Sequence, residues 1–456
     1  MQRKQSAHFE ELRRKYPVFL YENFSSEFNE TGLKISFDFN IPGLMRFAPS
    51  AIFHFGNRKE QYINNYINNK GLADLIIFHI GMIEMVSYWK SVCSPEISIN
   101  NHYINPEQAN WWSKLYYHGL GEFLFLNSIQ IEENNFVEFR SQGNPSTPIH
   151  WKGNEEAFIV PVGGGKDSAV SLQLLMNAGK QVTPLIINPR GATIDTVDAA
   201  GIDINETITI TRTLDKGILQ LNEQGFLNGH TPFSAMLAFY TLLAALLNGN
   251  KNIALSNEDS ANEPTIPGTQ INHQYSKSLT FENDFRAYYT KYISGDFNYF
   301  SFLRPLSELQ IISVFSKLTK FHNVFRSCNA GSKTNEWCGK CPKCLFTHIM
   351  LSAFTSIEYA NSIIGADMLN NPEMKKPFDE LCGIADIKPF ECVGTIDDVN
   401  AALSMILTKE ANTNPVLLEH YKQKIKQYPV DMSLNELSQN HNLTSDLAII
   451  LKEALS

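Results

Sequence analysis

The sequence lacks any long run of lysine or arginine, and acidic residues outnumber basic ones. Its 456 residues include 47 acidic and 38 basic side chains, which gives a formal net charge of −9. Non-specific binding to nucleic acids depends on basic side chains that neutralise phosphates. The charge balance therefore argues against a nucleic-acid partner.

The sequence pattern also offers no segment that we expect to cross a membrane. The longest apolar stretch, residues 235–247 (AMLAFYTLLAALL), is shorter than the ~20 residues that a spanning helix needs, so we expect a buried helix there. The opening residues MQRKQSAHFEELRRKY are charged throughout and lack the apolar core of a signal peptide. We therefore expect a cytoplasmic protein without a membrane partner.

Cysteine is scarce and unevenly placed. Of the seven cysteines, Cys338, Cys341 and Cys344 form a CxxCxxC pattern, and Cys328 lies just upstream. This distribution argues against a disulfide-rich secreted scaffold and favours a reducing compartment with a metal site. Four thiolates complete a closed tetrahedral Zn²⁺ site, although the pattern also serves iron–sulfur clusters or unligated thiols. Because four thiolates leave no position for water, we predict a structural metal site, with zinc as the first choice.

What the sequence does contain is a glycine turn between a predicted strand and a predicted helix. Residues 158–168 read FIVPVGGGKDS, and residues 169–176 (AVSLQLLM) continue as an apolar helix. Backbone N–H groups without neighbouring Cβ atoms, together with a helix N-terminus, can surround a phosphate. This turn predicts a nucleotide site made by Gly163, Gly164, Gly165, Lys166, Asp167 and Ser168.

Two common phosphate-binding motifs do not fit the turn. A Walker A loop needs a glycine where Val160 stands and Ser or Thr where Asp167 stands, and a dinucleotide motif needs a glycine where Ser168 stands. The turn instead resembles the PP-loop (SGGxDS) of ATP pyrophosphatases, with Gly163 in place of the first serine. That replacement removes one hydroxyl donor to the diphosphate. The remaining alternative is a glycine turn with a Ser or Asp helix cap.

The pattern around the turn predicts an α/β fold with a doubly wound parallel sheet. Predicted strands end at Val162 and cover 182–187, 207–211 and 252–256, and a helix is predicted over 232–247. Ligands of such sheets bind at the carboxyl ends of the strands. Residues 140–156, rich in polar, Gly and Pro residues, are the candidate linker.

These patterns divide the chain into three predicted parts. We expect an aromatic-rich N-terminal α+β substrate-recognition domain over 1–145 and a PP-loop ATP-binding domain with the four-cysteine metal site over 155–355. A helical C-terminal region follows over 356–456.

Two further loops follow strand ends in this layout. Glu258 and Asp259 could hold Mg²⁺ through carboxylate oxygens while phosphates fill the other positions, or they could form a solvated acidic loop. Residues 188–191 (NPRG) follow the strand at 182–187, where adenine and ribose dock in folds of this type. We expect both loops to contribute to the nucleotide site.

The chain as a whole resembles the UDP-N-acetylmuramoyl-L-alanyl-L-glutamate epimerases, the MurL family. Five segments carry the resemblance, namely FHIGMIEMVSYWK (78–90), WWSKLYYHGLGEF (111–123), VPVGGGKDS (160–168), LSNEDSANEPT (255–265) and KPFECVGT (388–395). The C-x9-CxxCxxC pattern after the PP-loop is also similar to the 7-cyano-7-deazaguanine synthases. Those enzymes are much shorter and have nothing like the first 150 residues.

The MurL resemblance implies an ATP-dependent amino-acid epimerase with a UDP-sugar dipeptide as its small-molecule substrate. It implies conversion of the terminal L-Glu of UDP-N-acetylmuramoyl-L-Ala-L-Glu to D-Glu through carboxylate adenylation. ATP and Mg²⁺ are the implied cofactors, and AMP and diphosphate are released. The alternative interpretation is a PP-loop ligase or thiolase that modifies a tRNA or a nucleobase. A nucleotide-binding regulator without turnover is a third.

The acid and base that would invert Cα are less well defined. We predict that Lys166 and Asp167 act in adenylation from a solvent-facing loop, and we name Cys392 and His230 as acid/base candidates. A buried thiol and a helix-capping histidine are the competing interpretations of the latter two. Glu84 and Lys90, in an aromatic-rich predicted helix, could contact the UDP-sugar or lie on the surface. Cys93 and Cys382 are the other thiols outside the cluster.

Overall fold

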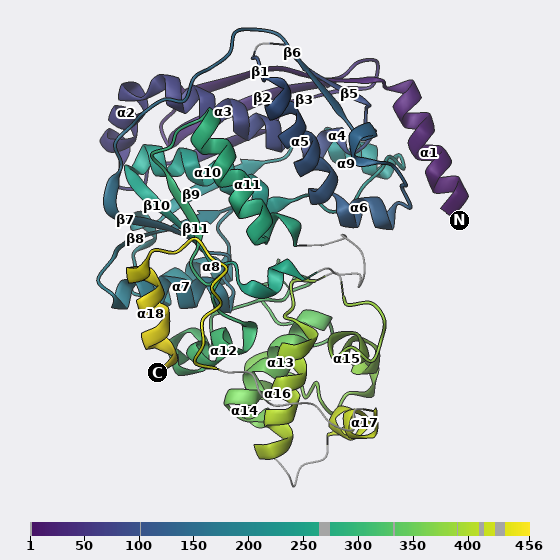
Figure 1. The fold of residues 1–456 in the computed structure, drawn as a ribbon, viewed down its shortest axis with the longest axis vertical. Helices are drawn as coiled ribbons and strands as arrows, with labels where there is room; N and C mark the ends of the chain where they lie inside the picture. Colours follow the sequence, from purple (N-terminus) through teal and green to yellow (C-terminus); the bar gives the residue numbers. More distant parts are fainter. Residues whose placement is uncertain are drawn as a thin grey trace. The chain divides into compact units, whose positions relative to one another are not determined.

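The computed structural model describes residues 2–100, 102–263, 274–331, 333–389, 391–409, 415–424 and 434–456 (Figure 1). The chain folds as two compact units that are interleaved along the sequence. The first comprises Met1–Ile159, Ile208–Ile253 and Tyr275–Tyr299, and the second comprises Val160–Thr207, Ala254–Gln274 and Phe300–Ser456. The predicted three-part division stays a prediction.

The first unit contains a mixed sheet with the strand order β9-β4-β2-β1-β5-β6. Antiparallel pairing joins β1 to β2, β2 to β4 and β4 to β9, and parallel pairing joins β1 to β5 and β5 to β6. In β2 the apolar residues alternate with polar ones, so that one face is buried and sets the register. The strands are β1 (Val18–Phe28), β2 (Gly32–Ile41), β3 (Met45–Phe47, paired with β2), β4 (Ser50–His54), β5 (Glu96–Ile99), β6 (Glu138–Ser141) and β9 (Ile208–Thr213).

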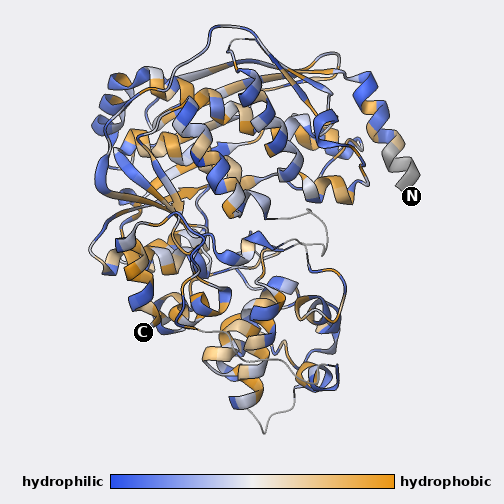
Figure 2. Ribbon diagram, in the orientation of Figure 1, coloured by the Kyte–Doolittle hydropathy of each residue, from blue (hydrophilic) through white to orange (hydrophobic). Residues whose placement is uncertain are grey.

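The helices of the first unit form an aromatic-rich core in which α3 packs against α10. The predicted helix at 232–247 is confirmed as α10, whose side chains are buried on nearly every face. Figure 2 shows the contrast between this hydrophobic helix and the hydrophilic α2. The helices are α1 (Gln2–Lys15), α2 (Lys59–Asn68), α3 (Lys70–Glu84), α4 (Val86–Trp89), α5 (Pro106–Gly119), α6 (Gly121–Leu126), α9 (Gly217–Glu223), α10 (Phe233–Asn248) and α11 (Leu279–Tyr292).

One helical stretch among the described residues, Lys70–Trp89, is long and apolar enough to cross a membrane when judged by length and composition. Of its apolar window, 89% is buried inside the protein, as is usual for a core helix. The sequence pattern did not single it out, because His79 and Glu84 interrupt the apolar residues.

The second unit carries the strand–turn–helix that the sequence predicts. Strands β7 (Asn154–Pro161), β10 (Asn250–Leu255) and β11 (Asn298–Ser301) begin in the first unit and end in the second, and with β8 (Gln181–Ile187) they have the order β11-β10-β7-β8. The pair β7–β10 is parallel, with Ile253 opposite Ile159. Among the described residues after 302, regular structure is helical. The helices of this unit are α7 (Lys166–Asn177), α8 (Gly191–Ala199), α12 (Glu308–Lys317), α13 (Pro342–Phe354), α14 (Ile357–Ile364), α15 (Lys375–Leu381), α16 (Ile396–Lys409), α17 (Val416–Lys424) and α18 (Ser445–Leu455).

The α/β fold class predicted from the sequence is confirmed, with many helices and an aromatic-rich first region. The sheet is mixed rather than parallel throughout, because β9 pairs antiparallel with β4. The predicted strands correspond to β7, β8, β9 and β10, with small shifts at their ends. The candidate linker is shorter than predicted, because Arg140 and Ser141 belong to β6 and residues 154–156 begin β7. The PP-loop assignment of the fold stays a prediction.

Candidate active site and metal centre

The glycine turn joins the end of β7 to the start of α7. Gly164 has a φ of +82°, and a Cβ placed on it would lie 2.8 Å from the carbonyl carbon of Ala192 at the start of α8. Only glycine meets both conditions without strain. Gly163, in contrast, faces open space, since a Cβ added to it would have no atom within 4 Å. Gly165 is the N-cap residue of α7, and no side chain caps this helix. The first N–H groups of α7 therefore face the turn.

The structure corrects the expectation that Lys166 lies on a solvent-facing loop. Helix α7 begins at Lys166, three residues earlier than predicted, and this residue is only 3% exposed. Its Nζ donates to Asp167 and, at 2.5 Å, to Oε2 of Glu308 at the start of α12. A buried ammonium requires such anionic partners, because an unpaired charge in the interior costs several kcal/mol. Asp167 is about one-third exposed and keeps access to solvent.

Carboxyl groups outnumber the ammonium in this cluster. Burial raises the pKa of Glu308, and the nearby carboxyls of Asp167 and Glu258 add to that rise, whereas the ion pair with the Lys166 ammonium opposes it and favours the charged carboxylate. Burial likewise raises the pKa of Asp398, which accepts a hydrogen bond from the backbone N–H of Leu309 in α12. The pKa of Lys166 is lowered by burial but raised more by its two carboxylate partners, and the net change is upward. The Lys166 ammonium thus lies among several carboxyl groups that are buried or half-buried.

The two carboxylates of the predicted acidic loop differ in burial. Glu258 is buried, its Oε1 accepts a hydrogen bond from Ser260 at 2.9 Å, and its backbone oxygen accepts one from Arg304. Asp259 is exposed and accepts from Asn262 at 3.1 Å. Glu258 is thus the carboxylate that belongs to the Lys166 cluster. Pro264 and Thr265, from the segment that resembles the MurL family, lie outside the described residues.

The loop at 188–191 lies beside the turn through α8. Arg190 is the exposed N-cap residue of α8, and Asn188 has a φ of +52°. The contact of Gly164 with Ala192 places the start of α8 directly against the glycine turn. Asn335 packs on Gly191 so closely that a Cβ there would lie 2.2 Å from its side chain.

The segment that carries Cys392 packs against Glu308. A Cβ on Gly394 would lie 2.9 Å from Cγ of Glu308, so that the loop and the carboxylate side chain are in direct contact. Lys388, 8% exposed, donates to the backbone oxygen of Gly394 at 2.9 Å and to a carboxylate oxygen of Glu263. Cys392 itself is half-buried. Phe390, in the same segment, lies outside the described residues.

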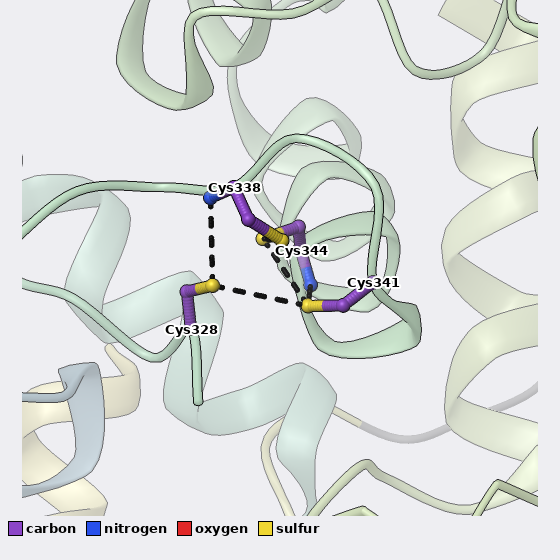
Figure 3. Close-up of side chains that lie close together, drawn as sticks. All are labelled: Cys328, Cys338, Cys341 and Cys344. Carbon is purple, nitrogen blue, oxygen red and sulfur yellow. Dashed lines mark hydrogen bonds between the residues drawn. The ribbon is translucent and has the colours of Figure 1, made fainter. Parts of the chain in front are cut away.

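Four cysteine side chains converge in the second unit (Figure 3). Their sulfur atoms all lie within 4.8 Å of one another, with 3.9 Å between Cys328 and Cys341, 3.7 Å between Cys338 and Cys344, and 3.4 Å between Cys341 and Cys344. A tetrahedral Zn²⁺ with bonds of ~2.3 Å would hold its sulfurs ~3.8 Å apart, which agrees with these distances. The four thiols could therefore hold a metal ion.

Local backbone structure supports thiolates at this position. The N–H groups of Gly331 and Cys338 donate to the sulfur of Cys328 at 3.2 and 3.4 Å, and that of Cys344 donates to Cys341 at 3.4 Å. Cys341 is the N-cap residue of α13, where the helix dipole also favours negative charge. N–H donors to sulfur are the usual outer contacts of a metal–thiolate site.

His230 belongs to the first unit, whereas the glycine turn and Cys392 belong to the second. Its Nδ1 lies 3.4 Å from a carboxylate oxygen of Glu122, and about a quarter of its side chain is exposed. Lys90 supports the same loop by donating to Thr231 at 2.7 Å and to the backbone oxygen of Gly229. Burial lowers the pKa of Lys90 to about 8.

The alternative that Glu84 and Lys90 lie on the surface is wrong, because both are buried. Glu84 forms an ion pair with Arg212 at 2.6 Å and accepts from the Tyr240 hydroxyl at 2.7 Å. Cys93 and Cys382 are also buried, and burial raises the pKa of each thiol.

Sequence reasoning did not single out Glu308, Asp398 or Lys388. Glu308 lies 142 residues from Lys166 along the chain, and nothing local marks it as a buried partner. The available signal was the capping box formed by Ser307 and Gln310, which predicts a helix start at Glu308 but not its burial.

Comparison with known proteins identifies the family. The family model described as the MurL N-terminal domain matches residues 10–302, and the MurL C-terminal domain matches residues 324–435. A protein of Xanthomonas oryzae pv. oryzae is 34% identical over 336 residues, which cover 72% of this chain and 73% of that protein. A Salinispora tropica protein is 33% identical over 339 residues (73% and 72%), and a Micromonospora protein is 31% identical over 331 residues (71% and 73%). All three are named UDP-N-acetyl-alpha-D-muramoyl-L-alanyl-L-glutamate epimerase. The resemblance seen in the sequence is thus confirmed, and the chain belongs to the MurL family.

Proposed function

We propose that this chain converts the terminal L-Glu of UDP-N-acetylmuramoyl-L-Ala-L-Glu to D-Glu in peptidoglycan precursor synthesis, with ATP converted to AMP and diphosphate. The observation that carries the proposal is the glycine turn of the GGGKDS segment, set between a buried strand and α7, in a chain of the MurL family. The named relatives support the epimerisation and its substrate. The turn supports the use of ATP.

The proposed ATP site is the turn itself. Residues Gly163, Gly164 and Gly165 and the first N–H groups of α7 would surround the phosphates, with Lys166, Asp167 and Ser168 in the first helical turn. The uncapped N-terminus of α7 supports this role, because its N–H groups have no side-chain acceptor. The open space at Gly163 leaves room for an anion beside the turn.

Magnesium fits the charge of this cluster. The carboxyls of Asp167 and Glu258 lie near enough to Glu308 to raise its pKa, so an added divalent cation would relieve their mutual repulsion. We propose that Glu258 and Asp259 hold Mg²⁺ together with phosphate oxygens, as hard oxygen ligands suit this ion. When bound, Mg²⁺ would neutralise phosphate charge during the displacement at the α-phosphorus.

The chemistry explains why an epimerase would use ATP. A free α-carboxylate opposes loss of the neighbouring Cα proton, because the carbanion would carry a second negative charge. In the proposed reaction a carboxylate oxygen attacks the α-phosphorus of ATP, and diphosphate leaves. The acyl-adenylate is uncharged at the carboxyl carbon, so a side chain can remove the Cα proton and another can return a proton to the opposite face. Water then hydrolyses the mixed anhydride to the carboxylate and AMP.

Cys392 and His230 are the proposed acid/base candidates. For Cys392, the support is that its loop packs on Glu308, which contacts Lys166 of the proposed ATP site. For His230, the support is a partly exposed ring beside the Glu122 carboxylate, which can hold the ring in one tautomer. Lys166 and Asp167 are proposed to act in the adenylation step.

We propose that the four-cysteine cluster holds one structural Zn²⁺. The sulfur–sulfur distances suit tetrahedral zinc, and all four ligand positions are thiolates. Zinc would join residues 326–331 to the first turn of α13. Its proposed role is structural, because four thiolates leave no position for a reacting water.

The experiment that tests the function uses deuterium. The protein is incubated with ATP, Mg²⁺ and UDP-N-acetylmuramoyl-L-Ala-L-Glu in D₂O, and the glutamate enantiomers are resolved after hydrolysis. D-Glu that carries deuterium, with AMP formed alongside, is the expected result. Free L-Glu should react poorly, because binding of the UDP-sugar positions the reacting carbon. AMP without D-Glu would rule out the epimerase and leave a PP-loop ligase or thiolase. D-Glu without ATP would rule out adenylation.

A further inference from the structure

Glu308 contacts the proposed ATP site on one side. It is the first residue of α12, it is 4% exposed, and its Oε2 lies 2.5 Å from Nζ of Lys166. Lys166 is the first residue of α7, directly after the glycine turn, and its ammonium also contacts Asp167. Glu308 therefore determines where this ammonium is held relative to the turn.

The same side chain contacts the Cys392 loop on its other side. A Cβ on Gly394 would lie 2.9 Å from Cγ and 3.1 Å from Cβ of Glu308, closer than ordinary van der Waals contact. The absence of a side chain at Gly394 thus lets the loop approach Glu308. Lys388 closes this loop by donating to the Gly394 carbonyl at 2.9 Å.

A second set of contacts fixes the loop to α12. Asp398 accepts from the backbone N–H of Leu309 at 3.2 Å through one oxygen. Through its other oxygen it accepts from the N–H and hydroxyl of Thr395 at 3.1 and 2.7 Å. These hydrogen bonds hold the end of the Cys392 loop against the start of α12, next to Glu308. Several contacts therefore fix the position of the Glu308 carboxylate.

We propose that Glu308 is a positioning residue that aligns the ATP-binding turn, through Lys166, with the loop that carries Cys392, through Gly394. The inference rests on the proposed function, since it assigns the adenylation step to one side of Glu308 and proton transfer at Cα to the other. Glu308 acts through its neighbours and does not itself exchange protons with the substrate. A buried ion pair that only stabilises the fold is the competing explanation.

Two substitutions test the two contacts separately. Glu308→Gln keeps the shape of the side chain but removes the charge that holds Lys166. Gly394→Ala leaves that charge in place and pushes the Glu308 side chain from the loop side. Adenylation is measured by substrate-dependent exchange of labelled diphosphate into ATP, and proton transfer by deuterium uptake at Cα. Glu358→Gln, an exposed glutamate in the first turn of α14, is the matched control.

We expect each single variant to lower diphosphate exchange by about tenfold to a hundredfold, as displacements of catalytic groups by ~1 Å do. The informative result concerns Gly394→Ala, because residue 394 lies on the Cys392 loop and the atoms nearest to its Cβ position belong to Glu308 and Phe346. In the Glu308→Gln background, Gly394→Ala should lower exchange by less than about threefold, since moving an uncharged side chain no longer moves the ammonium. A merely structural role would give equal losses in both backgrounds.

A binding measurement separates the failure of this inference from failure of the proposed function. If the wild type forms neither AMP nor D-Glu, the proposed function fails. The role of Glu308 still stands in that case if both single variants bind ATP more weakly and their losses of affinity are not additive. If the wild type is active and Gly394→Ala retains full diphosphate exchange while folded, the positioning role is wrong. Equal fractional losses in the two backgrounds would also overturn it.

Discussion

The backbone N–H of Arg326 donates a hydrogen bond of 2.7 Å to the carbonyl oxygen of Gly164. Arg326 lies two residues before Cys328, the first thiol of the cysteine cluster, and Gly164 is the middle glycine of the turn. The next residue, Ser327, also contacts the turn, because its hydroxyl oxygen would lie 3.1 Å from a Cβ placed on Gly165. The cysteine cluster therefore supports the glycine turn through the main chain.

This connection predicts that metal loss weakens ATP binding although the metal touches no nucleotide. The purified protein should carry about one zinc per chain and be colourless. Cys341→Ser should lose the metal, destabilise α13 and raise the dissociation constant for ATP by about tenfold, or ~1.4 kcal/mol. Metal analysis and titration calorimetry measure both effects, with Cys382→Ala, a buried thiol outside the cluster, as the control. Visible charge-transfer absorption would instead indicate an iron–sulfur cluster.

Neighbouring glycines in the turn should respond in opposite ways to serine. Gly163→Ser restores the serine of the usual PP-loop pattern and meets no atom within 4 Å, so stability should change by less than about 0.5 kcal/mol. The added hydroxyl should tighten ATP binding. Gly164→Ser should cost about 1–3 kcal/mol, because its φ is +82° and Ala192 stands 2.8 Å from the new Cβ. Urea unfolding and ATP titration of the two variants check this. Weaker ATP binding by folded Gly163→Ser would contradict the proposed phosphate position.

Substitutions of Lys166 and Asp167 should also differ. Asp167→Ala should abolish AMP formation with little loss of stability, since Asp167 is partly exposed. Lys166→Ala should lower the free energy of unfolding by about 3–5 kcal/mol, because it leaves Glu308 buried without its cation. The double variant Lys166→Ala/Glu308→Ala should recover part of that loss. Urea denaturation decides this, and a Lys166→Ala variant of wild-type stability would show that the pair does not form in solution.

The acid/base candidates predict one-sided exchange. If Cys392 removes the proton from the L-epimer, Cys392→Ser should stop deuterium uptake from that epimer with ATP present. Exchange from the D-epimer should persist, because the opposite face uses another group. AMP formation should continue in this variant, since adenylation precedes proton transfer. Normal exchange from both epimers would remove Cys392 from the mechanism, and the same pair of measurements applies to His230→Gln.

The sequence was sufficient where the pattern is local. The apolar run to Pro161, three glycines and the apolar stretch of α7 predict strand, turn and helix, and each of these is confirmed. The four cysteines lie within 17 residues of chain, so their convergence could be anticipated from spacing. Helix α10 and strand β10 are recognisable for the same reason, because each has a local apolar pattern.

Burial of charged residues could not be predicted, because the compensating partner is distant in sequence. Lys166 is paired with a residue 142 positions away, and Glu84 with Arg212, 128 positions away. Without these partners, each charge is typical of a surface position. The interleaving of the two units was not predictable for the same reason, because it depends on contacts between distant segments. Elements β9, α10 and α11 follow the glycine turn in sequence but belong to the first unit. Only the tertiary structure brings such segments together.

A buried histidine in the first unit predicts a specific loss of stability in acid. Nδ1 of His79 lies 2.8 Å from the carbonyl oxygen of Leu75, which can only accept, so Nδ1 carries the proton. Nε2 therefore accepts from the Tyr288 hydroxyl at 3.0 Å, and Trp112 donates to the same hydroxyl oxygen at 2.9 Å. This network requires neutral imidazole. Burial lowers the pKa of His79 to about 3, although the hydrogen bond to Leu75 opposes the change.

The sign of the pH effect follows from this depressed pKa. Between its unfolded value of ~6.5 and about 3, the unfolded chain binds a proton at His79 that the folded protein does not, so stability falls as pH decreases. From pH 7 to pH 5 the loss from this residue should be ~2 kcal/mol. His79→Phe removes the titrating group. Between pH 7 and pH 5 the free energy of unfolding of this variant should therefore fall by ~2 kcal/mol less than that of the wild type. This difference is expected even if the variant is less stable than the wild type at pH 7. Urea unfolding at pH 7, 6 and 5 measures this difference, and parallel pH dependences of wild type and variant would show that His79 is not held neutral.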